Sequence, residues 1–131
     1  MSTNQPKRKA VLVAEENEDE REGMASILRR EGYEVFTAED GDQAILQLQY
    51  GPKVDAIVMD MLLPKRDGWA LLQARQRFPE LAAIPVVIVT KLGIPNPNWA
   101  KPLGAAAYYR KPVASAELLE GIRRILSARS V

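Results

Sequence analysis

The chain has 131 residues, enough for one ordinary domain with a single core but not for two. Lys and Arg number 18 against 17 Asp and Glu, and this balance argues against nucleic acid as the main partner. There is no Cys and no His, which excludes disulfides, thiolate or imidazole metal sites, and Ser-His or Cys-His catalysis. No apolar run is long enough to cross a membrane and no signal peptide opens the chain, so we expect a soluble, cytoplasmic protein.

The first nine residues, "MSTNQPKRK", form a polar arm that ends in basic residues. The arm has too few apolar side chains to pack onto a core, so we expect residues 1–9 to be disordered. Residues 10–131 then form one domain, without an internal repeat or a linker.

Short apolar runs alternate with segments of helical periodicity along the rest of the chain. The runs cover residues 10–14, 33–38, 54–59, 84–89 and 105–109. Three of them are apolar nearly throughout, which is typical of strands buried on both faces of a parallel sheet. This alternation predicts an α/β fold, a doubly wound, flavodoxin-like sheet of about five parallel strands between helices.

Local signals mark where the helices begin and end. Asn17 and Asp40 are each followed three residues later by Glu or Gln, as in a capping box. Gly32 and Gly51 stand where the first two helices should end. The periodicity predicts two more helices, starting at residues 67 and 115.

The segment 91–104, "KLGIPNPNWAKPLG", interrupts this rhythm where the fourth helix belongs. It contains Pro95, Pro97 and Pro102. A proline inside a helix costs about 3 kcal/mol, so we expect the fourth helix to be short, displaced or absent.

Polar residues follow the predicted strands at their carboxyl ends, where open parallel sheets bind ligands. The first strand leads into Glu15 and Glu16, the third into Asp60 and the fourth into Thr90. Lys111 follows closely after the fifth strand. The fold therefore predicts that three carboxylates, one hydroxyl and one ammonium group gather at one rim.

Carboxylates without His or Cys suit a hard cation, and Mg²⁺ commonly takes one or two carboxylates together with waters and a phosphate. Lys and Thr provide the charge and the donor that a phosphoryl group needs. An aspartate between a metal and a lysine can attack phosphorus and form an aspartyl phosphate. A plainer reading of Glu15 and Glu16 is that they only favour the start of a helix by their charge.

Four stretches, in this order and at these separations, resemble the receiver domain of bacterial two-component response regulators. They are "VLVAEEN", "VDAIVMDMLLPKRDGWALL", "VVIVT" and "AYYRKP". The most specific pieces are the segment from Asp60 to Gly68 and the pair Lys111–Pro112. The resemblance covers nearly the whole chain after the N-terminal arm.

By this resemblance Asp60 is the phosphoacceptor, which takes a phosphoryl group from a sensor histidine kinase, a phosphotransfer protein or a small acyl phosphate. Glu15 and Glu16 match the paired acids that hold Mg²⁺, together with Asp60 and the backbone carbonyl of Leu62. The resemblance implies a protein that accepts a phosphoryl group, and can lose it by itself, without being a turnover enzyme.

The resemblance also implies how the signal is passed on. Thr90 matches the switch hydroxyl, Lys111 the lysine that pairs with the phosphate, and Tyr108 the aromatic switch residue. Pro112 follows Lys111 through a bond that is usually cis in the family, as cis bonds generally precede proline. An output protein or effector domain would bind the face made by the fourth helix, fifth strand and fifth helix.

Two positions depart from the family pattern. The acidic pair is usually aspartate, and Glu16 is longer by one carbon–carbon bond of about 1.5 Å. Lys91 follows Thr90 where the family has a small residue, so it would either cover the acceptor or give the phosphate a second cation. These departures leave an alternative open, a pseudo-receiver that binds partners through the same fold without phosphorylation.

Overall fold

The computed structural model describes residues 8–93 and 104–129. Most of the arm expected to be disordered, 1–7, lies outside the described residues. So does most of the segment 91–104, on which the expectation of a short or irregular fourth helix rests.

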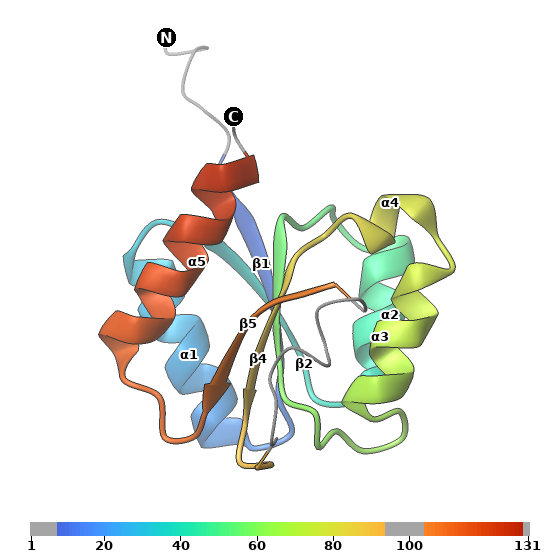
Figure 1. Ribbon diagram of the computed structural model, residues 1–131, viewed down its shortest axis with the longest axis horizontal. Helices are drawn as coiled ribbons and strands as arrows, with labels where there is room; N and C mark the ends of the chain where they lie inside the picture. The colour runs from blue at the N-terminus through green and yellow to red at the C-terminus, as the bar shows by residue number, and fades with distance from the viewer. Residues whose placement is uncertain (1–7, 94–103, 130–131) are drawn as a thin grey trace, which may run out of the picture.

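The sheet has five strands, all parallel, in the order β2-β1-β3-β4-β5 (Figure 1). The strands are β1 Ala10–Ala14, β2 Glu34–Ala38, β3 Ala56–Met59, β4 Val86–Thr90 and β5 Ala105–Arg110. The predicted doubly wound α/β sheet is confirmed, with every predicted run present as a strand.

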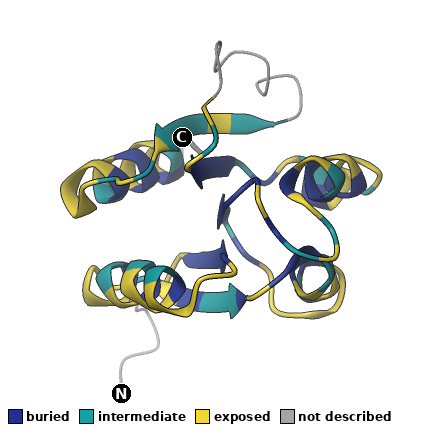
Figure 2. Ribbon diagram, turned by 90° about the horizontal axis from the view of Figure 1, so that it is seen from below, coloured by how far each residue is buried: buried dark blue, intermediate teal, exposed yellow. Residues whose placement is uncertain are grey.

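Burial follows position in the sheet. Every residue of β1, β3 and β4 is buried, whereas β2 and β5, the two edge strands, are partly exposed (Figure 2). The three central strands contain the runs that are apolar nearly throughout, because both of their faces are covered by helices. Their side chains alternate between two core layers, with Leu12 in one and Val11 and Val13 in the other.

Helices cover both faces of the sheet (Figure 1). One face carries α1 Glu18–Arg30 and α5 Ser115–Arg129; the other carries α2 Gly41–Tyr50, α3 Gly68–Gln76 and the short α4 Pro79–Ala82. Leu28 and Ile122 pack in the first layer, and Leu48 and Leu72 in the second. None of the helices within 8–93 and 104–129 is long and apolar enough to cross a membrane.

The helix starts agree with the predicted caps. The side chains of Asn17 and Asp40 accept hydrogen bonds from the backbone N–H of Glu20 and Gln43, respectively. The single turn α4 was not predicted; it begins with Pro79 at a first helical position, where the missing N–H costs nothing.

The order of the strands positions the site. β1 lies between β2 and β3: the chain passes from β1 to β2 on one side, and the next connection crosses back to β3 on the other side. The carboxyl ends of β1 and β3 flank the crevice where such sheets bind ligands. Asp60 extends this arrangement past the end of β3, because its N–H donates to the carbonyl oxygen of Ala14 at 3.1 Å.

Candidate functional site

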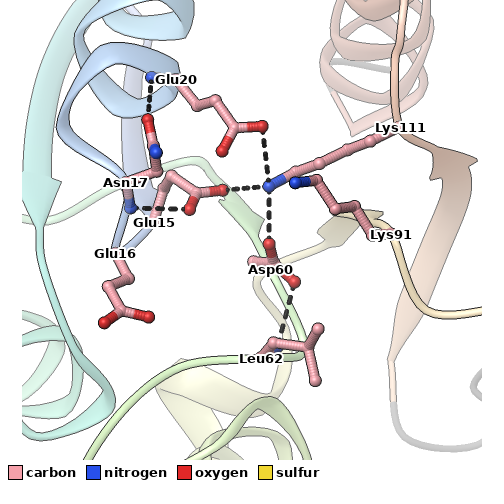
Figure 3. Close-up of a pocket in the computed structure, with 8 residues that line it drawn as sticks. All are labelled: Glu15, Glu16, Asn17, Glu20, Asp60, Leu62, Lys91 and Lys111. Carbon is pink, nitrogen blue, oxygen red and sulfur yellow. Dashed lines mark hydrogen bonds and ion pairs between the residues drawn. The ribbon is translucent and has the colours of Figure 1, made fainter.

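A cavity of about 430 Å³ opens at the carboxyl end of the sheet (Figure 3). It is lined by Glu15, Glu16, Asn17, Glu20, Asp60, Leu62, Lys91 and Lys111. The predicted convergence of the strand ends at one rim is therefore observed.

Asp60 lies at the centre of this pocket and is 5% exposed. Both of its carboxylate oxygens accept hydrogen bonds. Its Oδ1 accepts from the backbone N–H of Leu62 at 2.9 Å and from the Thr90 hydroxyl at 2.6 Å. Its Oδ2 accepts from Lys111 Nζ at 2.7 Å. Such donors stabilise negative charge on and around this carboxylate.

Lys111 reaches the pocket from the end of β5, where its N–H donates to the carbonyl oxygen of Thr90 at 2.9 Å. The predicted cis bond to Pro112 is present. Its Nζ contacts three carboxylates, those of Asp60 and Glu15 at 2.7 Å each and that of Glu20 at 3.2 Å. One ammonium group thus joins three carboxylates, two from the region where β1 leads into α1 and one from the end of β3.

These contacts shift the pKa values in different directions. Burial alone would raise the pKa of Asp60, but the Leu62, Lys111 and Thr90 hydrogen bonds and the Lys111 charge outweigh it, so this pKa is lowered. Burial dominates for Glu15, whose pKa is raised. The pKa of Lys111 is raised because its bonds to Asp60 and Glu15 outweigh the opposing effect of burial.

The two adjacent glutamates have different surroundings. Glu15 is 3% exposed; its carboxylate binds Lys111 and accepts from the N–H of Asn17 at 2.9 Å. Glu16 is exposed, and Figure 3 shows its carboxylate pointing away from Asp60 and Lys111. The structure therefore brings Glu15 to the acceptor and leaves Glu16 at the edge of the pocket.

The fit to Mg²⁺ can be tested on these donors. The pocket offers carboxylate oxygens, the ligands that Mg²⁺ takes. Lys111 already binds Glu15 and Asp60, and no group of three acidic residues in the described parts of the chain is arranged to hold a metal. The donor chemistry fits, whereas the outward position of Glu16 leaves the predicted ligand set incomplete in this conformation.

A chain of hydrogen bonds leads from Asp60 to the predicted switch residues. The Thr90 hydroxyl donates to Asp60 and accepts from the N–H of Leu92 at 3.3 Å. The carbonyl oxygen of Leu92 accepts from the Tyr108 hydroxyl at 2.7 Å. Thr90 and Tyr108 are thus joined through one backbone residue.

Two residues near the site were not predicted to belong to it. Arg21, 7% exposed on α1, donates through Nη1 to the carbonyl oxygens of Glu15 and Glu16 at 3.0 and 3.1 Å and fixes the turn after β1. Glu20 was identified only as a capping residue, yet its carboxylate binds Lys111. The signal available for both was their position in the first turn of a helix that starts at the pocket.

The comparisons with known proteins agree with this site. Residues 11–123 match the family model described as the response regulator receiver domain. The chain is 30% identical over 118 residues to protein PilH of Pseudomonas aeruginosa, covering 89% of this chain and 97% of PilH. It is 33% identical over 119 residues to the transcriptional regulatory protein PdtaR of Mycobacterium tuberculosis, covering 89% of this chain and 56% of PdtaR. The chain thus spans nearly all of PilH but only about half of PdtaR.

Solved structures of receiver proteins share this fold. The chemotaxis response regulator CheY4 of Vibrio cholerae superposes with a TM-score of 0.83 at 26% identity, over 91% of this chain and 99% of that one. The receiver domain of a Pseudomonas aeruginosa sensor histidine kinase, solved with a magnesium ion coordinated in its active-site cleft, gives 0.82 at 25% identity, over 92% and 99%. The chain belongs to the receiver domain family of two-component response regulators.

Proposed function

We propose that Asp60 is the residue that receives the phosphoryl group in this receiver domain. The observation that carries the proposal is the convergence of Thr90 Oγ1, Leu62 N–H and Lys111 Nζ on this one buried carboxylate. Negative charge that develops on a transferring phosphoryl group would meet a hydroxyl and an ammonium group already in place.

In the proposed reaction a carboxylate oxygen of Asp60 attacks the phosphorus of the donor. A bond forms between that oxygen and phosphorus, while the bond from phosphorus to the donor breaks and its electron pair leaves with the donor. Lys111 then shifts its hydrogen bond from the carboxylate to a phosphoryl oxygen, and the Thr90 hydroxyl donates to another. The donor is a phosphohistidine of a kinase or phosphotransfer protein, or a small acyl phosphate.

Receiver domains bind Mg²⁺ in their active site, and we propose that this one does so too. The ligands would be the carboxylates of Glu15, Glu16 and Asp60 with the backbone carbonyl of Leu62. When bound, the metal would neutralise charge on the phosphoryl oxygens. Glu16 has to turn inward for this, and its exposed side chain is free to change rotamer.

Receiver domains are signalling modules that interact with kinases or phosphotransfer proteins and with output partners. For this chain, the link from Thr90 through Leu92 to Tyr108 supports a switch that changes the β5 side of the molecule. We propose an output surface formed by β5, α5 and the segment 91–104, where the sequence places the fourth helix of the family, a helix distinct from α4, and we expect no turnover of a substrate. A cytoplasmic location stays a prediction.

The alternative of a phosphorylation-independent module is not needed, because the acceptor, hydroxyl and lysine all converge. Intact-mass spectrometry after incubation with acetyl phosphate, with and without Mg²⁺, tests the proposal. We expect one phosphoryl adduct on the wild-type protein and none on the Asp60→Asn variant. A folded wild-type protein without an adduct, beside a receiver domain labelled in parallel, would refute the assignment.

A further inference from the structure

A third carboxylate, outside the proposed acceptor and metal ligands, binds the site lysine. We propose that Glu20 is a positioning residue that retains the Lys111 ammonium group and slows phosphoryl transfer to Asp60. The inference rests on the proposed function, because it concerns the rate at which Asp60 is labelled.

The contacts of Glu20 place it at the mouth of the pocket. Its Oε1 lies 3.2 Å from Lys111 Nζ, and its side chain is 37% exposed, against 3% for Glu15 and 6% for Asp60. Its backbone N–H donates to the Asn17 side chain at 2.9 Å, which fixes the first turn of α1 beside the pocket. The Glu20 carboxylate points to Lys111, as Figure 3 shows.

The net charge around the pocket determines how the contact between Glu20 and Lys111 affects phosphoryl transfer. Four carboxylates and two ammonium groups line the cavity, a net charge of −2. A phosphoryl donor is itself an anion, so each uncompensated carboxylate at the mouth opposes its approach. Lys111 must also turn from its carboxylates to the phosphoryl oxygens. Glu15 and Asp60 belong to the proposed reaction centre, whereas Glu20 only competes for the lysine.

Initial rates of labelling by acetyl phosphate, followed by intact-mass spectrometry, test this role. Glu20→Gln keeps the shape of the side chain and removes its charge. We expect its rate at low ionic strength to rise about fivefold, and the gain to shrink as salt screens the charges. Glu18→Gln is the matched control, since Glu18 lies in the same helical turn, is exposed and does not line the pocket. Its rate should stay within about twofold of wild type.

The conservative variant Glu20→Asp separates charge from fold. It keeps the charge on a shorter side chain, so we expect a rate between those of the wild type and Glu20→Gln. A purely structural role would give no ionic-strength dependence and no partial rescue. Urea unfolding of each variant checks that the rates come from folded protein.

The labelling results distinguish a failure of the role of Glu20 from a failure of the role of Asp60. A wild-type protein that is never labelled refutes the role of Asp60, and the role of Glu20 with it. If the wild type is labelled, but Glu20→Gln and Glu18→Gln change the labelling rate equally or leave it unchanged, the role of Glu20 is refuted and that of Asp60 stands.

Discussion

Lys111 and Arg75 are two of the long cationic side chains buried in the described parts of this domain, and their surroundings differ. Lys111 lies at the carboxyl end of the sheet, where its ammonium group joins Asp60, Glu15 and Glu20. Arg75, 1% exposed on α3, donates through Nη1 to the carbonyl oxygens of Leu81 at 2.9 Å and Ala82 at 2.6 Å.

Their pKa values reflect this difference. Burial lowers the pKa of Arg75. At Lys111 the bonds to carboxylates outweigh burial and raise the pKa. Arg75 ties α3 to the end of α4, a structural role, whereas Lys111 holds acidic groups beside an open cavity, where they can exchange partners. A buried charge indicates function here only where it borders a cavity and other ionisable groups.

The largest expected effect on stability comes from Arg75→Met, which replaces the arginine with an uncharged side chain of similar volume. It removes this donor from the carbonyl oxygens of Leu81, which is buried, and Ala82, which is half-buried. The free energy of unfolding should fall by about 3 kcal/mol. Urea denaturation measures it, and labelling by acetyl phosphate should be retained wherever the variant is folded. A loss below about 1 kcal/mol would refute the structural role.

Lys111→Met should cost less, about 2 kcal/mol at pH 7, because the carboxylates that it leaves behind border an open pocket. The cost should shrink in acid. The lowered pKa of Asp60 means that its contribution to wild-type stability is present above its unfolded-state pKa and lost as the pH falls through its folded-state pKa. In the variant, protonation removes the uncompensated charges. Urea denaturation at pH 7 and pH 4 measures this, and an equal cost at both would contradict it.

Alanine substitutions at two glycines test how firmly the Arg75 side chain is held. Gly104 and Gly32 both have positive φ, 95° and 96°. A methyl group on Gly104 would overlap the Arg75 guanidinium, whereas one on Gly32 would meet nothing. Gly32→Ala should cost about 1 kcal/mol for backbone strain alone, and Gly104→Ala about 1 kcal/mol more for the overlap. Thermal unfolding of both variants compares them; equal costs would show that Arg75 yields freely.

The smallest expected effect is a difference in pKa between Asp60 and Glu15, the two carboxylates that bind Lys111 most closely. Carbon-13 NMR of the side-chain carboxyl groups should show Asp60 titrating below its ordinary value of 3.8 and Glu15 above its ordinary 4.5. Because the groups are close, both curves should be distorted by their coupling. The reverse order would mean that Lys111 favours Glu15 over Asp60.

Most of the fold was predictable from the sequence because local signals agreed with long-range packing. The apolar runs, the caps at Asn17 and Asp40 and the glycine ends are each explained by a few neighbouring residues. The turn α4 was missed because four residues carry no periodicity, and Pro79 favours loops as well as helix starts.

The site was predictable at the strand ends and not beyond them. Asp60 and Lys111 directly follow strands and Thr90 is the last residue of one, so the parallel sheet alone brings them together. The outward turn of Glu16 and the contact between Glu20 and Lys111 depend on side-chain rotamers and on the direction of α1. Neither leaves a pattern in the sequence. Arg75 likewise reads as an ordinary surface cation of a helix until its burial is known.

The most direct test of the central claim locates the phosphoryl group. Borohydride reduces an acyl phosphate to the alcohol, so treatment after labelling, followed by peptide mass mapping, marks the acceptor. We predict reduction at Asp60 alone, with Glu15, Glu16 and Glu20 unchanged. Reduction at any of the glutamates, or an adduct that persists in Asp60→Asn, would contradict the account.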